Sequence, residues 1–176
     1  MDVAPLAGWE NFYVIVGSSA GGLTGITFVV VALIRDVAGG ARPTGVGVFV
    51  TPTIVHFGGV LALSAYLSMP HLGVLSLSAG CGAVGLAGLA YGVVIGTNMR
   101  RHRGEYILVR EDWIWNVILP TLAYGCLFAM AVLVWHRPMQ TLFGVAALCL
   151  ILLFIGIRNA WDIAVWMSLY KPRETK

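Results

Sequence analysis

The chain has 176 residues, of which 59% are hydrophobic and 11% are charged, and its formal net charge is +3. A water-soluble domain carries about 25% charged residues, so this composition excludes an ordinary soluble fold and favours a protein embedded in lipid. The sequence has no nucleic-acid-binding motif, so membrane lipid is the expected surrounding and no nucleic-acid partner is expected.

Five apolar runs are long enough to cross a bilayer, because a spanning helix needs about 20 mostly apolar residues. They are residues 12–34, 46–68, 72–98, 113–135 and 141–163. We therefore expect an all-α integral membrane protein, with residues 1–176 forming a single domain built as a five-helix transmembrane bundle. Pro52 and Pro120 fall inside the second and fourth runs, where each removes a helical hydrogen bond and is expected to bend the helix.

The 11 lysines and arginines are distributed unevenly between the two sides of such a bundle. Ten lie in the first and third linkers or near the C-terminus, and only Arg137 lies on the other side. Cytoplasmic segments collect Lys and Arg, so this pattern predicts the N-terminus outside and the C-terminus inside. The termini lie on opposite sides only if the number of spans is odd, which agrees with five.

Glycines recur every four residues in the first and third runs. Small residues at this spacing let helix backbones approach closely in a bilayer. The two ridges predict tight helix crossings, either within one protomer or between protomers, and the first ridge is expected to lie beside Ser76 and Gly80. Their members are Gly17, Gly21 and Gly25 in "GSSAGGLTG", and Gly88, Gly92 and Gly96 in "GLAYGVVIG".

A first polar layer is expected halfway across the bilayer. At a rise of about 1.5 Å per residue, His56 lies about 16 Å into the second run, close to the midplane of a hydrocarbon core about 30 Å thick. Thr24 and Tyr124 fall at the same depth, and Thr53 shares a helix face with His56. An ionisable residue in a bilayer is a candidate for function. A neutral imidazole bonded to Tyr124, to Thr24 or to a proline-freed carbonyl is a sufficient structural explanation.

A second polar layer is expected near the cytoplasmic edge. Arg158 and Asp162 are four residues apart in the fifth run, so they share a helix face and can pair. Asn159 lies beside them and offers both a donor and an acceptor. An interfacial ion pair that extends towards water is the structural alternative to a gate. The other members of this cytoplasmic-edge cluster are Thr51, Asn98 and Asn116.

No catalytic, cofactor or metal motif stands out, so we expect neither an enzyme nor a bound cofactor or metal. Haem between spans needs two facing histidines, but His71, His102 and His136 fall in linkers. Only a pair of His56 residues from two protomers would supply them. Asp162 is the lone carboxylate near the membrane interior, so no carboxylate pair for acid–base catalysis is expected there.

The segments "WENFYVIVGSSAGGLTGITFVVVAL", "TPTIVHF", "EDWIWNVILPTLAYG" and "IGIRNAWD" resemble a group of small, uncharacterised bacterial integral membrane proteins. The resemblance covers nearly the whole chain. It implies a multi-pass protein of the bacterial cytoplasmic (inner) membrane and a shared fold, and it implies no mechanism. The positions that carry it are Phe12, Tyr13, Gly17, Thr24, Gly25, Thr51, Pro52, Thr53, His56, Phe57, Glu111, Asp112, Trp113, Asn159, Ala160, Trp161 and Asp162.

Three functions fit these patterns. The preferred one is a homo-oligomeric protein that forms a permeation path for an ion or small solute, with His56 and Tyr124 along the path and the Arg158 cluster at its cytoplasmic mouth. The second is a non-catalytic accessory or regulatory subunit that binds another membrane complex through its glycine faces. The third is a cofactor-binding membrane protein in which His56 residues from two protomers hold one ligand.

Overall fold

The structure is a computed structural model that describes residues 8–37, 46–101 and 110–169, with side chains for 8–33, 51–101 and 110–165. Its regular elements are all helices. The fourth, fifth and sixth of them follow one another without a break, so the described chain forms five long rods. The elements are α1 (Glu10–Val37), α2 (Val46–Leu67), α3 (Val74–Arg101), α4 (Arg110–Trp113), the π-helical turn η2 (Ile114–Ile118), α5 (Leu119–Leu133) and α6 (Pro138–Leu169).

Each predicted span coincides with one rod. The all-helical prediction is therefore confirmed. Four rods are long and apolar enough to cross a membrane by length and composition, and α2 contributes a shorter apolar helix, Thr51–Leu67. The fifth crossing, by α2, stays a prediction. The four longer candidates are Glu10–Leu33, Val74–Arg101, Arg110–Leu133 and Pro138–Val165.

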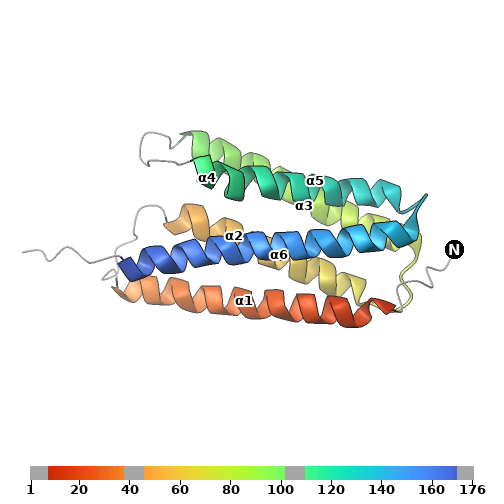
Figure 1. Cartoon of the computed structure of the whole chain (residues 1–176), viewed down its shortest axis with the longest axis horizontal. Coiled ribbons are helices and arrows are strands. Elements are labelled where there is room, and N and C mark those ends of the chain that lie inside the picture. The colour runs from red at the N-terminus through yellow and green to blue at the C-terminus, as the bar shows by residue number, and fades with distance from the viewer. Residues whose placement is uncertain (1–7, 38–45, 102–109, 170–176) are drawn as a thin grey trace, which may run out of the picture.

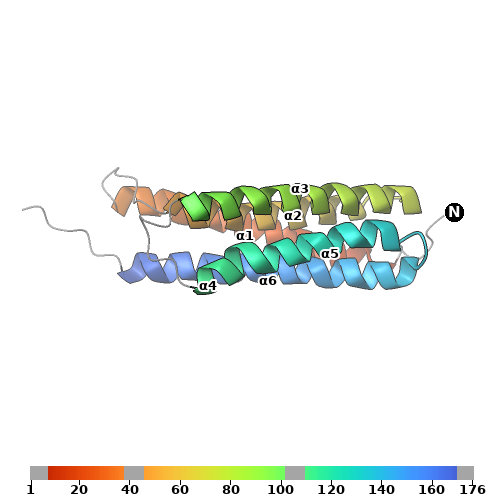
Figure 2. The ribbon, with the colours of Figure 1, turned by 90° about the horizontal axis from the view of Figure 1, so that it is seen from above.

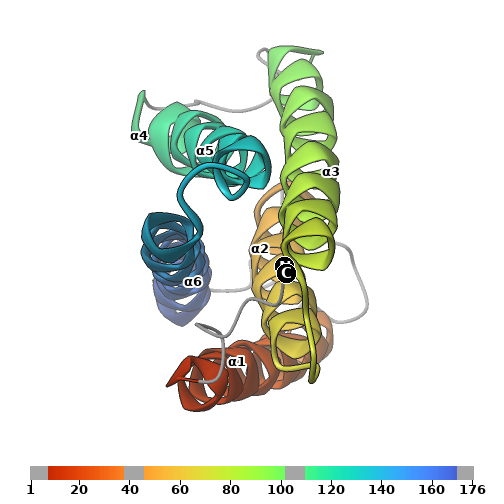
Figure 3. The ribbon, with the colours of Figure 1, turned by 90° about the vertical axis from the view of Figure 1, so that its right-hand side faces the viewer.

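The rods run roughly along one common axis (Figure 1), and the view from above shows the same alignment (Figure 2). Seen end-on, α2, α3, α5 and α6 surround a common interior, and α1 lies outside this group against α2 and α6 (Figure 3). Within the group, α2 and α5 lie across the interior from each other. Side chains from these two helices therefore meet only by reaching into the centre.

The two ends of the bundle differ in what they hold. The Trp9 end holds the start of α1 and the described connectors 68–73 and 134–137 (Figure 1). The Arg101 end holds the end of α3 and the start of α4.

The glycines of α3 set the close approach of α3 and α5. A Cβ on Gly88 would collide with the ring of Tyr124, and a Cβ on Gly85 would lie 2.7 Å from the backbone nitrogen of Phe128. The second predicted ridge therefore packs within the protomer, and Gly85 extends it towards the Trp9 end. Its other members do the same: Gly92 lies against Thr121, and Gly96 lies against Val117.

The glycine ridge of α1 is used only in part. Gly17 packs closely on α2, because a Cβ there would lie 2.9 Å from the Cβ of Ser64. Gly21 is less crowded, at 3.8 Å from Leu61, and a Cβ on Gly25 would meet nothing within 4 Å. The ridge therefore packs tightly at its start and lies open at Gly25.

The predicted neighbours of this ridge are wrong. The sequence predicts Ser76 and Gly80 beside it, but α1 packs chiefly on α2 and α6. Gly80 instead packs on the ring of Tyr66 in α2, whose hydroxyl donates to the Ser76 carbonyl at 3.0 Å. The small residues near the start of α3 therefore hold α3 against α2, which precedes it directly after the short connector.

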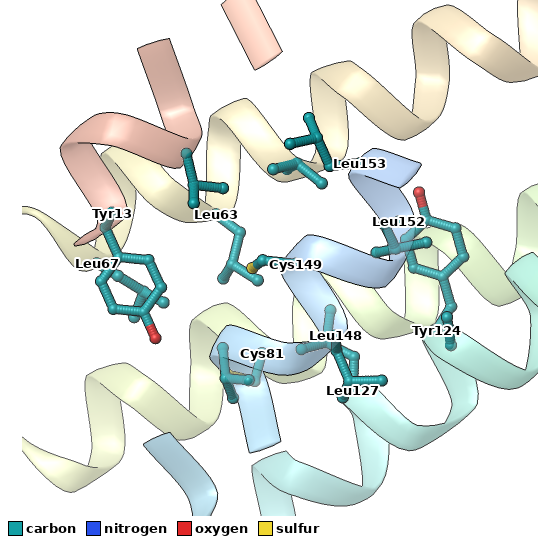
Figure 4. Packing of buried hydrophobic residues seen from close by; sticks show 14 of the residues in the cluster. Tyr13, Leu63, Leu67, Cys81, Tyr124, Leu127, Leu148, Cys149, Leu152 and Leu153 are labelled. Carbon is teal, nitrogen blue, oxygen red and sulfur yellow. The ribbon is translucent and has the colours of Figure 1, made fainter. Parts of the chain in front are cut away.

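The interior of the bundle is largely apolar. Tyr13 and Tyr124 lie at opposite ends of the buried cluster, with Leu63 and Cys149 between them (Figure 4). Cys81 and Cys149 are buried as free thiols. Apolar neighbours give a polar side chain few partners, so each polar group buried here needs a specific one.

Candidate functional site

His56 and Tyr124 meet at the centre of the bundle. His56 is 1% exposed, and its Nδ1 lies 3.1 Å from the hydroxyl oxygen of Tyr124, which is 2% exposed. The helical spacing of Thr53, His56 and Val60 keeps them on one buried face of α2. The predicted contact is therefore present, as a hydrogen bond from α2 to α5 across the interior. Its donor depends on which tautomer His56 adopts.

Two glycines make room for the Tyr124 side chain. Gly88 of α3 leaves the space that the ring occupies, since a Cβ there would collide with it. Gly59 follows His56 on α2, and a Cβ on it would lie 3.2 Å from the Tyr124 hydroxyl. A larger residue at either position would push the hydroxyl away from His56, so the glycines help to position the hydrogen bond.

The second ring nitrogen of His56, Nε2, is buried and has no hydrogen-bond partner among the described residues. Buried polar atoms in proteins almost always bond to protein or to ordered water. In either tautomer of a neutral imidazole, one nitrogen donates and the other accepts. His56 therefore has one nitrogen tied to Tyr124 and one that can bind a water molecule or a ligand.

The same condition occurs towards both ends of the bundle. The Tyr13 hydroxyl and Ser64 Oγ lie towards the Trp9 end, and Asn159 Oδ1 lies towards the Arg101 end. All three atoms are buried without a partner in the described part of the chain. Their residues are 3% exposed or less. We call this series the polar line and define it as Tyr13, Ser64, His56, Tyr124, Asn116 and Asn159.

The polar line extends over the length of a hydrocarbon core. Asn116 precedes Tyr124 by eight residues on one rod, a rise of about 12 Å. Ser64 follows His56 by eight residues, again about 12 Å. Gly17 packs on Ser64, and Tyr13 precedes Gly17 by four residues on α1, so Tyr13 lies about 6 Å further towards the Trp9 end. The sum is about 30 Å, which equals the thickness of a bilayer hydrocarbon core. The pair of His56 and Tyr124 lies near the middle.

The polar line ends at the π-helical turn. Asn116 Nδ2 donates to the Asp112 carbonyl at 3.0 Å, which turns its Oδ1 towards Asn159. Asn159 Nδ2 donates to that Oδ1 at 3.3 Å. These two bonds orient both amides, and they leave Asn159 Oδ1 as the atom without a partner.

Pro120 follows this turn and removes a further donor. In η2 the Leu119 N–H donates to the Ile114 carbonyl, five residues back. In an α-helical register, Pro120 would leave the Asn116 carbonyl, four residues back, without a donor. In the π-helical register the carbonyl left without a helical donor is that of Trp115. Turns of this kind are frequent at functional sites.

Arg158 lies at the edge of this end. It pairs with Asp162, as predicted, and its guanidinium carbon lies 5.4 Å from the centre of the Trp115 ring. The Arg158 and Asp162 side chains are 35% and 55% exposed, although Arg158 Nη1 itself is buried. The pair therefore borders the polar line beside Asn159, and it does not belong to the buried series.

Several predicted site residues lie away from the polar line. Thr24 donates to the Ala20 carbonyl of its own helix at 2.8 Å, since α1 packs outside the four-helix group. Of the three partners that the sequence allows for His56, the structure therefore shows Tyr124, and the depth of Thr24 stays a prediction. Thr51 and Asn98 are exposed. Thr53, by contrast, lies next to the polar line, because it is 0% exposed and shares the buried face of α2 with His56.

Tyr13 and Ser64 are the members of the polar line that the sequence reading missed. Ser64 offered a signal, because residues 56, 60 and 64 follow one another at four-residue spacing on one helix face. Tyr13 gave none. Its position depends on how the start of α1 meets α6, where the rings of Trp9 and Phe143 lie 4.7 Å apart.

The described residues hold no group of three or more His, Cys, Asp or Glu side chains suited to a metal ion. His71 and His136 lie in the connectors, and His102 lies outside the described residues. Comparison with known proteins gives no match: no family model, no curated protein and no solved structure matches the chain. The resemblance to small bacterial membrane proteins therefore stays a prediction.

Proposed function

We propose that the protein is a multi-pass protein of the bacterial cytoplasmic membrane that lets an ion or a small solute cross the bilayer. The polar line supports this proposal. Each buried polar atom left unpaired costs about 1–3 kcal/mol, so a bundle that needed only to pack would use apolar side chains there. Polar groups repeated over about 30 Å instead favour an interior that admits water or a permeant.

In this proposal α2 makes the fifth crossing, the Trp9 end faces outside and the Arg101 end faces the cytoplasm. The distribution of charge supports the orientation. Arg100, Arg101 and Arg110 lie at the Arg101 end, and Arg137 lies in a connector at the Trp9 end. Positive residues collect on the cytoplasmic side of membrane proteins.

The path that we propose runs through each protomer. His56 and Tyr124 are 1% and 2% exposed within a single chain, so they are suited to line its interior and not a symmetry axis between chains. Homo-oligomerisation remains part of the proposal, through the open part of α1. Small residues such as Gly25 allow a helix of a second copy to approach closely.

Flux in reconstituted lipid vesicles tests this function. Wild-type vesicles are expected to take up an ion or a small neutral solute faster than protein-free vesicles. His56→Ala is expected to change that flux while circular dichroism and elution volume stay those of the wild type. Gly73→Ala is the control, because a Cβ there meets nothing within 4 Å and the residue lies in the connector 68–73, away from the polar line. Wild-type vesicles that pass nothing would contradict the proposal, and an unchanged flux in His56→Ala would remove His56 from the path.

A second candidate is an accessory or regulatory subunit of another membrane complex. The outward face of α1 favours it: Ile26, Phe28 and Val29 are 59–62% exposed, beside the open Gly25. Purification in mild detergent separates the two candidates. A stoichiometric foreign membrane protein would support the accessory role, whereas a pure homo-oligomer would support the permeation proposal.

The third function, a cofactor held by His56 from two protomers, has little geometric support. Its ligand would have to reach the imidazoles of both chains, and His56 is 1% exposed inside one bundle. A visible absorption spectrum of the purified protein tests it directly, because bound haem absorbs strongly.

A further inference from the structure

We infer that the species that crosses is the proton, passed along the polar line by side chains and water, with His56 and Tyr124 as the central relay. The inference rests on the proposed permeation function and names its substrate class. Three features of the bundle carry it: the small number of ligand atoms at the centre, the tight packing around them, and the chemistry of the pair.

A metal cation finds too few ligands at the centre. Such ions exchange their hydration shell for a full set of oxygens, such as the six to eight ligands typical of Ca²⁺ or the carbonyl rings of K⁺ channels. In the described bundle, one imidazole and one hydroxyl form the central hydrogen bond, and the hydroxyls of Thr53 and Tyr91 are the further neutral groups close to it, which is still fewer than such a set. The nearest described carboxylate of α6, Asp162, lies at the Arg101 end and is 55% exposed. A cation stripped of water would therefore stay uncompensated at this level.

A neutral solute finds little room. The Tyr124 ring rests directly on Gly88, and the Phe57 ring rests directly on Gly156, so that a Cβ on either glycine would collide with the ring. Leu127 and Leu152 are buried in the same cluster. A solute must displace such side chains to pass, whereas a proton needs only a chain of hydrogen bonds.

The central pair has the chemistry of a relay. A neutral imidazole can accept a proton on one nitrogen and release one from the other, and a hydroxyl can accept and donate at the same time. In the tautomer with Nδ1–H donating to Tyr124, an incoming proton binds Nε2 of His56 and forms an imidazolium. The Nδ1 proton then passes to the Tyr124 oxygen while the hydroxyl proton leaves to a water molecule.

This step balances. One proton enters at His56 Nε2, one leaves from Tyr124, and both side chains end neutral. The hydroxyl then rotates back, and the ring regains the first tautomer when water takes up the proton on Nε2 and supplies one to Nδ1, with no net change in charge. The unpartnered Nε2 is the atom that the mechanism requires to be free for the incoming proton.

Water completes the chain on both sides of the pair. The rise of about 12 Å from His56 to Ser64, or from Tyr124 to Asn116, exceeds one hydrogen bond. At about 2.8 Å per O–H···O bond, about three bridging waters would cover each interval. The unpartnered atoms of Ser64 and Asn159 offer these waters a place to bind.

Proton flux into vesicles that hold a pH-sensitive dye tests the inference, with a K⁺ gradient and valinomycin setting the membrane potential. Wild-type vesicles are expected to acidify faster than protein-free vesicles. His56→Gln keeps a polar side chain but loses the relay, and Tyr124→Phe loses only the hydroxyl. Both are expected to fall to the protein-free rate. Tyr66→Phe is the matched control, since that hydroxyl bonds to a carbonyl away from the polar line.

A rescue experiment covers the case in which a variant misfolds. His56→Gly leaves a space the size of an imidazole, and added imidazole is expected to restore proton flux in that variant alone. Circular dichroism and elution volume identify the variants that keep the fold.

The outcomes distinguish this inference from the function on which it rests. Wild-type vesicles that pass Na⁺, K⁺ or urea but no protons would overturn the proton inference and leave permeation standing. Vesicles that pass none of these would overturn both. Proton flux that persists unchanged in His56→Gln and in Tyr124→Phe would overturn the relay.

Discussion

At the scale of single residues, the hydrogen bond between His56 and Tyr124 matters most for the stability of the bundle, because both groups are buried in an apolar interior. Hydrogen bonds between membrane helices contribute about 0.6 kcal/mol on average and up to about 1.7 kcal/mol. Leaving one buried partner unpaired costs about 1–3 kcal/mol. Removing one partner should therefore destabilise the bundle more than the bond itself stabilises it.

A double-mutant cycle on this pair tests the reasoning. We expect Tyr124→Phe to lower the free energy of unfolding by about 1–3 kcal/mol, because His56 Nδ1 loses its partner. His56→Leu combined with Tyr124→Phe is expected to cost less than the sum of the two single changes, because no polar atom is then left unpaired. Unfolding in mixed micelles measures all four proteins. Strictly additive costs would show that the two side chains do not interact.

At the scale of helices, glycine positions decide which pairs of rods approach closely. The glycines of α3 let α5 rest on its backbone, and the same contact seats Tyr124 at the centre. The glycines of α1 do this only at Gly17, so the rest of that helix can move or bind a partner without disturbing the interior. Similar sequence motifs therefore have different roles in the two helices.

A matched pair of alanine variants tests this difference. Gly88→Ala places a methyl group where the Tyr124 ring lies, so it is expected to lower stability by about 1–3 kcal/mol. Gly22→Ala, on α1, enters open space, and alanine is the better helix former by about 1 kcal/mol, so no loss of stability is expected. Thermal unfolding in detergent compares them. A similar shift for both variants would contradict the packing described for α3 and α5.

The sequence predicts the rods well and their contacts only in part. Apolar run length is local information, so the five spans agree with the rods, although α6 continues to Leu169. Depth along a helix is also local, and it brings His56 and Tyr124 to one level. Depth does not say which way a helix faces, so the sequence cannot choose between Thr24 and Tyr124 as the partner of His56, and it gives no sign that Tyr13 points into the interior. The π-helical turn before Pro120 lies against both α3 and α6, and these contacts are likewise not local information.

At the scale of the whole molecule, the odd number of rods predicts opposite sides for the two chain termini, and the positions of the arginines predict which end of the bundle faces the cytoplasm. The Trp9 end carries Arg137 and the Arg101 end carries Arg100, Arg101 and Arg110. A polar line that crosses the bilayer requires this arrangement, because its two ends must open to different compartments.

Cysteine labelling in sealed vesicles tests the arrangement. We expect a membrane-impermeant maleimide to label Arg137→Cys from outside and Arg101→Cys only after the vesicles are opened. Both positions are exposed, so access in the folded protein is not limiting. The native Cys126 is exposed and is replaced by serine in both variants, whereas Cys81 and Cys149 are buried and serve as an internal control for an intact fold. Labelling of both introduced cysteines from one side would mean that the bundle does not span the bilayer as proposed.

The most direct test of the polar line is an experimental structure in lipid at a resolution that shows ordered water. We expect water within hydrogen-bond distance of His56 Nε2, Ser64 Oγ and Asn159 Oδ1, and further waters between these atoms. An interior in which these atoms contact only apolar side chains, with no water between the two ends, would contradict a path through the protomer.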